Sequence, residues 1–204
     1  MRESLTGVTP VKGKLIRTAA STLARAFQEY PVSVFLEPDA VKRQKEQPGI
    51  FRDLIKANLS NGMIYGTSLK MEGVAVWLFI DKIKTLSTPR RTFREWLQAI
   101  REDKLKTQRR QAFMDYSKAV RDRILPERYW YLQVLGVDHA WQGKGFASVL
   151  LKPMLALAEK QGVVCFLETQ LEKNVSLYSH FGFTVAEEGI IPGSDVYSWA
   201  MIKR

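Results

Sequence analysis

The chain has 204 residues, of which 46% are hydrophobic and 25% charged, an ordinary composition for a globular protein with a sizeable core. It has no run of about 18 apolar residues that could span a membrane, and its N-terminal stretch MRESLTGVTPVKGKL lacks the apolar core of a signal peptide. A single cysteine excludes an internal disulfide, and with only two histidines it does not supply a zinc site. We therefore expect a cytoplasmic protein with no metal site and no membrane partner.

The net charge of +10 is unevenly distributed along the chain. Residues 1–129 carry 25 Lys and Arg against 14 Asp and Glu, whereas residues 130–204 carry 6 against 7. Such an excess is typical of a solvated helical surface, or of a surface that attracts polyanions. No zinc-finger spacing, RNP-like aromatic strand or compact basic cluster accompanies it, so nucleic acid is not the favoured partner.

Two helical segments are predicted near the N-terminus. Residues 15–29 carry apolar residues at helical spacing, and Pro31 is expected to end this helix. Residues 39–60 are also helical in pattern, with Pro48 expected to interrupt or bend them.

A hairpin and a charged segment are predicted in the middle of the chain. The stretch GMIYGTSLKMEGVAVWLFI, residues 62–80, has two apolar runs around a polar segment and reads as an antiparallel hairpin. Residues 91–123 are the most charged part of the chain and predict one or two surface helices.

After Pro126 the pattern changes to alternating strands and helices. Gly136 lies inside the first of these strands, where a glycine indicates a bulge or a close approach of another backbone. Pro153 lies inside the helix that follows and predicts a kink or a missing backbone bond. The expected elements are a strand at 129–137, a helix at 144–161 ending near Gly162, a strand at 163–169, a short helix at 174–181 with Asn174 as its N-cap, and strands at 183–191 and 196–203.

The loop QGKGFA, residues 142–147, is typical of phosphate binding. A P-loop would need a glycine further upstream and a Ser or Thr directly after the lysine, and neither is present. The dinucleotide fingerprint fits Gly143, Gly145 and the later Glu168, but Ser148 replaces its third glycine and too little chain follows for a doubly wound sheet. Two interpretations stay open, a tight turn before a helix and a pyrophosphate held by backbone N–H groups at the helix start.

The spacing around this loop resembles a known family, the GNAT superfamily, whose acyl-CoA loop reads Q/R-x-x-G-x-G/A. The order of strand, loop, helix and strand is also similar, and the stretch from Tyr129 to Phe183 resembles the puromycin-type branch of antibiotic and small-amine acetyltransferases. The residues that carry the resemblance are Gln142, Gly145 and Ala147 in the loop, followed by Asn174, Leu177-Tyr178 and Gly182-Phe183.

The resemblance implies an α/β (α+β) fold with a mixed central sheet of six to seven strands, splayed at the acetyl-CoA site and flanked by helices. It implies a single domain over residues 1–204, in which residues 1–129 form the acceptor side and residues 130–204 the acetyl-CoA core. The backbone of the strand before the loop would pair with the pantetheine arm like an added strand. The residues implied to bind acetyl-CoA are Leu135, Val137, Gln142, Gly143, Lys144, Gly145, Phe146, Ala147, Ser148 and Asn174.

The implied reaction transfers an acetyl group from acetyl-CoA to a primary amine of a small molecule by direct attack in a ternary complex. The resemblance assigns Tyr178 as proton donor to the departing thiolate. Many relatives place a glutamate where this chain has Tyr131, so Glu168 is the candidate base, acting directly, through water or by holding a cationic amine. The alternative for Tyr178 is a tyrosine packed in the core, and the alternative for Glu168 is a solvent-facing residue at the end of a strand. We expect His139 to be a surface residue and Cys165 a buried thiol.

The acceptor side carries weaker signals. Tyr30 and Trp77 are candidates for acceptor contacts, although each also fits the core, and the helical segment at 91–123 either covers the site or packs elsewhere. Two other functions stay open, a protein or peptide N-acetyltransferase and a non-catalytic module that binds CoA or nucleic acid. Both a monomer and a homodimer fit the sequence.

Overall fold

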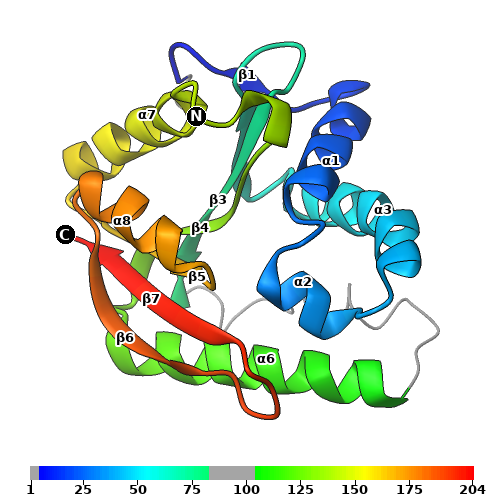
Figure 1. Cartoon of the computed structure of the whole chain (residues 1–204). Helices are drawn as coiled ribbons and strands as arrows, with labels where there is room; N and C mark the ends of the chain where they lie inside the picture. Colours follow the sequence, from blue (N-terminus) through cyan, green and yellow to red (C-terminus); the bar gives the residue numbers. More distant parts are fainter. Residues whose placement is uncertain (1–4, 83–103) are drawn as a thin grey trace.

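The computed structural model describes residues 5–82 and 104–204 (Figure 1). The elements follow the order β1 (Thr9–Pro10), α1 (Leu15–Ala26), α2 (Pro31–Leu36), α3 (Ala40–Asn58), β2 (Gly62–Gly66), β3 (Gly73–Asp81), α6 (Lys104–Ile124), β4 (Arg128–Val137), the short 3₁₀ helix η1 (His139–Trp141), α7 (Phe146–Gln161), β5 (Val164–Thr169), α8 (Glu172–His180), β6 (Thr184–Ile190) and β7 (Tyr197–Lys203).

One seven-stranded sheet, in the order β1-β2-β3-β4-β5-β7-β6, runs through the molecule. β4 and β5 are parallel, and every other neighbouring pair is antiparallel. This confirms the mixed sheet and the predicted hairpin of β2 and β3. The sequence did not predict β1, because a two-residue strand carries no detectable alternation.

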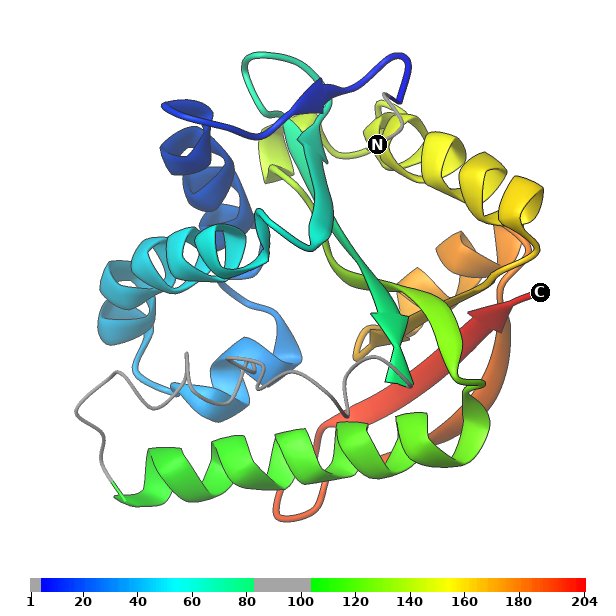
Figure 2. The ribbon, with the colours of Figure 1, turned by 180° about the vertical axis from the view of Figure 1, so that it is seen from behind.

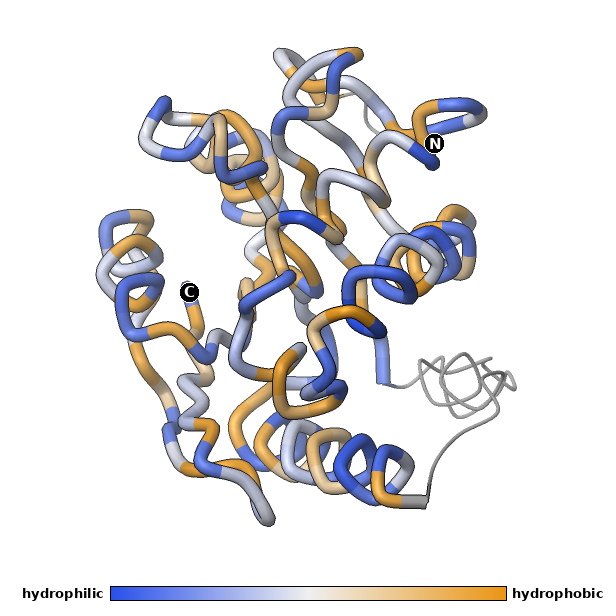
Figure 3. Tube along the Cα trace, turned by 45° about the vertical axis from the view of Figure 1, so that its right-hand side comes forward, coloured by the Kyte–Doolittle hydropathy of each residue, from blue (hydrophilic) through white to orange (hydrophobic). Residues whose placement is uncertain are grey.

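Helices cover both faces of the sheet (Figure 2). α7 and α8 pack on one face against alternate residues such as Trp130, Leu132 and Leu167. On the opposite face, α1 and α3 cover the half of the sheet that contains β2 and β3, and α6 covers β4, β5 and β7 through residues such as Val120 and Phe166. Hydrophilic and hydrophobic residues alternate along α6, the lower helix in Figure 3. The helices α1, α3 and α6 therefore lie on the same face of the sheet, with α1 and α3 over one half and α6 over the other.

Helix α6 corrects the prediction of surface helices over residues 91–123. Its described part begins at Lys104, so the preceding residues of that prediction lie outside the described ranges. Val120 and Ser117 are buried, and Arg110 is only 6% exposed. The many charges suggested a solvated helix, but one side of α6 packs on the sheet, and that side also carries Arg110 and Arg121.

Two boundaries near the N-terminus also differ from prediction. α1 ends at Ala26, and Pro31 begins α2 instead of ending α1. Proline is well tolerated in the first turn of a helix, because the N–H group that it lacks has no partner there. α3 runs through Pro48 without interruption, and its start is fixed by Asp39, whose carboxylate accepts from two backbone N–H groups.

Gly136 is explained by close approach and not by a bulge. A Cβ built at this position would lie 2.8 Å from a Leu23 methyl and 3.1 Å from both Ala26 and Phe27. The missing side chain lets α1 lie directly against β4. None of the helices in residues 5–82 and 104–204 has the length and apolarity that a bilayer crossing requires.

Candidate active site

β4 and β5 separate in the middle of the sheet. They pair from Tyr129 with Val164 as far as Leu132 with Leu167, and β4 continues to Val137 beyond the last of these pairs. This confirms the expected splay. The part of β4 that faces the gap includes the Leu135 and Val137 backbones that the sequence analysis assigned to the pantetheine arm.

A bulge at Gln133 lies at the start of the splay. Val76 of β3 pairs with Val134, and the next residue of β3, Trp77, pairs with Leu132. Gln133 is therefore the extra residue of β4. The bulge resets the alternation of β4, so that Leu132 and Leu135 both pack on the α7 side, whereas Val134 packs with α1 and α3. The predicted bulge was placed three residues too late, because Gly136 was the only glycine in the strand.

The glycine loop presents its backbone to solvent. Gly143 and Gly145 have positive φ angles of 76° and 80°, and a Cβ at either position would meet nothing within 4 Å. Gln142 donates from Nε2 to the Val137 carbonyl at 3.1 Å, which ties the loop to the end of β4. Gly145 is the N-cap of α7, whose first N–H groups have no partner within the helix. This uncovered helix start, with Lys144 beside it, fits the pyrophosphate of CoA.

Replacing Gly145 with Ala is expected to weaken CoA binding about tenfold in Kd, because a Cβ disfavours the left-handed backbone that aims the loop amides. Isothermal titration calorimetry with CoA measures this change. Gly162→Ala is the matched control, since Gly162 ends the same helix with φ 62° and a Cβ there would also meet nothing within 4 Å. Both variants should lose about 1 kcal/mol of stability. Equal CoA affinity in the two variants would contradict the assignment of the loop.

Glu168 lies in a buried ion pair at the end of β5. Its side chain is 5% exposed, and its Oε2 accepts from Arg121 Nη1 at 3.0 Å and from the Tyr131 hydroxyl at 3.2 Å. Among the described residues, the buried Oε1 atom has no hydrogen-bond partner. The interpretation of Glu168 as a solvent-facing strand end is therefore wrong. A buried carboxylate oxygen without a partner is costly, and a ligand N–H or a bridging water would satisfy it.

Burial raises the pKa of Glu168 above the usual range of a carboxyl group, and the positive charge of Arg121 opposes this change without cancelling it. A carboxylate with a raised pKa is a stronger proton acceptor, so it is better suited to general-base chemistry near neutral pH. Arg121 from α6 was not predicted, because nothing in the highly charged segment around it distinguishes a buried arginine from a solvated one. Tyr131 on β4 is thus hydrogen-bonded to a carboxylate from the neighbouring strand β5.

Tyr178 and Asn174 lie on α8, beside the end of β5. Tyr178 is 7% exposed and contacts Phe183 edge to face. Burial raises the pKa of its hydroxyl, so the proton stays on the oxygen over the physiological range. Asn174 is not the N-cap of α8, which is Leu171; it lies in the first turn and donates to Thr169 Oγ1 at 3.1 Å. The helix begins earlier than predicted because Glu172 and Lys173 belong to it.

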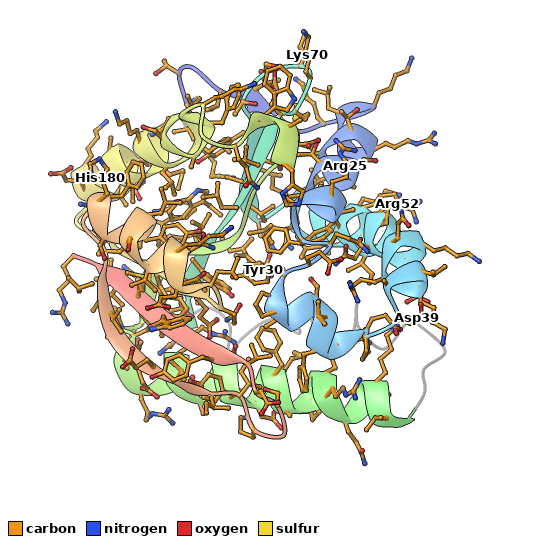
Figure 4. All side chains as sticks on the ribbon, viewed as in Figure 1. Arg25, Tyr30, Asp39, Arg52, Lys70 and His180 are labelled. Carbon is orange, nitrogen blue, oxygen red and sulfur yellow. The ribbon has the colours of Figure 1, made fainter. Side chains whose placement is uncertain are left out.

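Tyr30 connects the N-terminal helices to the end of β5. It is the N-cap of α2 and is labelled in Figure 4. Its hydroxyl lies 3.1 Å from Thr169 Oγ1 and accepts from the Gln170 N–H at 2.9 Å. Tyr30 also lines the cavity described below, so it stays a candidate for an acceptor contact. Trp77 does not line it and is fully buried in the core, which is the alternative that the sequence analysis gave for it.

These side chains line one cavity of about 640 Å³. The cavity lies between α6 on one side and α1, α2 and α3 on the other, and it reaches the splay between β4 and β5. Glu168, Tyr178, Asn174, Tyr30 and Leu135 all contribute to its wall. Its volume is within the range of pockets that hold drug-sized ligands.

Two other candidate groups lie away from this wall. His139 is exposed in η1, where its ring lies 3.2 Å from Gln142 Nε2. Cys165 is 1% exposed, and burial raises the pKa of its thiol to about 12. A thiol that stays protonated is a poor nucleophile, so the expectation of a buried structural cysteine agrees with its environment.

Residues 94–183 match the family described as Acetyltransferase (GNAT) family. The chain is also 27% identical over 188 residues to an uncharacterized N-acetyltransferase of Schizosaccharomyces pombe. The aligned region covers 85% of this chain and 72% of that protein. Both similarities are to proteins described as acetyltransferases.

Solved structures share the fold. A histone acetyltransferase HPA2-related protein of Corynebacterium glutamicum has a TM-score of 0.60 at 21% identity, covering 98% of this chain and 96% of that one. A polyamine N-acetyltransferase of Drosophila melanogaster has a TM-score of 0.63 at 12% identity, covering 96% and 97%. The PaiA N-acetyltransferase of Thermoplasma acidophilum, solved with coenzyme A, has a TM-score of 0.57 at 12% identity, covering 99% of each chain. The seven-stranded, splayed sheet is thus the GNAT fold.

Proposed function

We propose that this chain, which carries a GNAT acetyltransferase domain, transfers an acetyl group from acetyl-CoA to a primary amine of a small molecule. The observation that carries the proposal is the cavity of about 640 Å³ whose wall includes both Glu168 and Tyr178. A cavity of this volume is in the range that holds a drug-sized molecule, which supports a small acceptor rather than a peptide. We place the chain in the puromycin-type branch on its loop and α8 residues.

The wall residues would divide the proton transfers between them. Glu168, directly or through one water, accepts a proton from the ammonium so that its nitrogen can attack the acetyl carbonyl carbon. As the new N–C bond forms and the C–S bond breaks, Tyr178 donates its proton to the sulfur. The nitrogen gives up a second proton, which restores the tyrosine through solvent. The balance is one ammonium and one thioester converted to one amide, one thiol and one released proton.

Positioning supplies much of the remaining rate enhancement. The loop at Gly143–Ser148 would hold the pyrophosphate, and the free edge of β4 at Leu135 and Val137 would pair with the pantetheine arm. Asn174, fixed by its bond to Thr169, would border the end of that arm. The thioester would then lie at the splay, between Glu168 and Tyr178.

An acetyl-transfer assay tests the proposal. Release of the CoA thiol is followed with small primary amines and with peptides that carry free α-amino or lysine amino groups, and products are identified by mass spectrometry. We expect acetylated small amines and no acetylated peptide. Peptide acetylation without small-amine acetylation contradicts the proposal, and CoA binding without any turnover indicates a non-catalytic module.

A further inference from the structure

We infer that the acceptor is a monoamine whose body carries no second charge, an inference that rests on the function proposed above. The buried wall of the cavity contains carboxylates, but each of them in the described residues is already paired with a cation of the chain. The remaining wall is largely apolar. The cavity can therefore take one reacting amine and an uncharged body behind it.

At the reaction end, Glu168 and Arg121 form one balanced pair at 3.0 Å. Two further charged residues, Asp115 and Lys118, line the cavity but are exposed at its rim. Asp115 accepts a hydrogen bond from Gln111, the residue one turn earlier on α6. Among the described residues, Glu168 is therefore the one buried carboxylate at this end, and the carboxylate of Asp115 stays in solvent.

At the far end, α6 is joined to α2 and α3 by a second charge cluster. Lys106 Nζ lies 2.7 Å from Glu37 Oε2 and 2.8 Å from Glu46 Oε2. Burial alone would raise the pKa of Glu37, but the bond from Lys106 outweighs it and the pKa is lowered, so this carboxyl is an anion. Arg110, 6% exposed, also feels the charge of Glu46. The cations of Lys106 and Arg110 thus balance the two carboxylates, and this cluster is neutral.

The other polar groups of the far end are uncharged or satisfied. Arg43 is 3% exposed and donates to the carbonyls of Gln28 at 2.6 Å and Glu37 at 2.7 Å, and its charge is balanced by Glu29, whose Oε1 lies 3.1 Å from Nη2. Gln47 donates from Nε2 to the Phe27 carbonyl at 3.1 Å, and among the described residues its buried Oε1 has no hydrogen-bond partner. A neutral donor on the ligand, such as a hydroxyl, would suit that amide oxygen.

The wall between the two ends is apolar. It includes Phe27, Leu36, Ile50, Phe51, Phe113 and Met114. An ammonium brought into such a wall loses its hydration without gaining a counter-charge, which is strongly unfavourable. A hydrocarbon, aromatic or hydroxylated body incurs no such loss.

Three amines of the same heavy-atom count test the inference in the wild-type chain. Hexylamine, aminopentanol and cadaverine end in a methyl, a hydroxyl and an ammonium respectively. We expect kcat/KM for hexylamine and aminopentanol to exceed that for cadaverine by at least ~100-fold, measured by CoA thiol release. The same order is expected for the binding of the three amines to the CoA-saturated chain by calorimetry.

A variant should reverse this discrimination. Lys106→Met leaves Glu37 and Glu46 without their shared cation, so the ratio of cadaverine to hexylamine kcat/KM should rise at least ~10-fold. Lys45→Met is the matched control, because Lys45 is exposed on α3, does not line the cavity, and its loss changes the net charge equally. In Lys45→Met, the ratio of cadaverine to hexylamine kcat/KM should stay at the wild-type value. Thermal unfolding of both variants separates a loss of fold from a change of preference.

The outcomes distinguish this inference from the proposed function. Turnover with cadaverine equal to or above that with hexylamine overturns the inference and leaves the acetyltransferase activity standing. No turnover with any of the amines removes the proposed function, and calorimetry then decides the inference alone. Equal binding of the three amines, or no binding of any, overturns it.

Discussion

Glu168→Gln is expected to lower kcat with a small amine by at least ~100-fold, within the usual range for loss of a general base. The amide keeps the size of the side chain but cannot accept a proton from the ammonium. It also leaves Arg121 without its carboxylate partner. Initial rates of CoA thiol release at saturating acetyl-CoA measure the effect.

Two controls accompany this variant. Glu188→Gln removes an exposed carboxylate from β6 of the same sheet and should leave kcat unchanged. Calorimetry should show the same CoA affinity in Glu168→Gln and wild type, because Glu168 lies away from the loop. A kcat within about threefold of wild type in Glu168→Gln would remove it as the base.

The pH profile tests the role of Arg121 as a positioning residue. The base must be deprotonated, so activity falls as the pH drops through the pKa of Glu168, which burial raises and Arg121 partly lowers. Arg121→Met removes the opposing charge, and the acid limb of kcat/KM should therefore move to higher pH. Arg121→Lys keeps the charge and should restore most of the wild-type profile. An unchanged acid limb in Arg121→Met would show that Glu168 does not control it.

Tyr178→Phe is expected to lower kcat by ~100-fold and to leave the Kd for acetyl-CoA nearly unchanged. The variant removes only the hydroxyl, so the edge-to-face contact of the ring with Phe183 is retained. The thiolate would then depart without a proton donor. Single-turnover rates of acetyl transfer isolate this step from product release.

Tyr197→Phe is a matched control for Tyr178→Phe. Tyr197 begins β7, is 37% exposed and does not line the cavity. Its loss of a hydroxyl should not change the single-turnover rate. Wild-type turnover in Tyr178→Phe would reduce Tyr178 to a core residue, the alternative that the sequence left open.

The part of the fold from β4 to β7 is largely predictable from local sequence. The order of elements from β4 to β7, the left-handed glycines of the loop and Gly162 as the C-cap of α7 all follow from short-range patterns. The bulge was misplaced because its residue, Gln133, carries no local signal. A bulge is set by the register between two strands, which depends on pairing with β3.

The cavity wall contributed by α2, α3 and α6 is less predictable because it is built from long-range contacts. Arg121 meets Glu168 across 47 positions of the chain, and Lys106 meets Glu37 across 69. In the sequence, both cations lie among many others, and only the packing of α6 distinguishes them. Tyr30 was nominated for its aromatic ring alone, and its hydroxyl bonds at the end of β5 could not be inferred from its neighbours.

Initial-rate kinetics with acetyl-CoA and a neutral-bodied monoamine varied together test the account most directly. Lines that intersect in the double-reciprocal plot, with acetylated amine as the product, are predicted for direct transfer in a ternary complex. The same pattern is expected for Cys165→Ala, since the buried thiol takes no part. Parallel lines would indicate a covalent acyl-enzyme, and a reaction that yields CoA without acetylated amine would contradict acetyl transfer at this cavity.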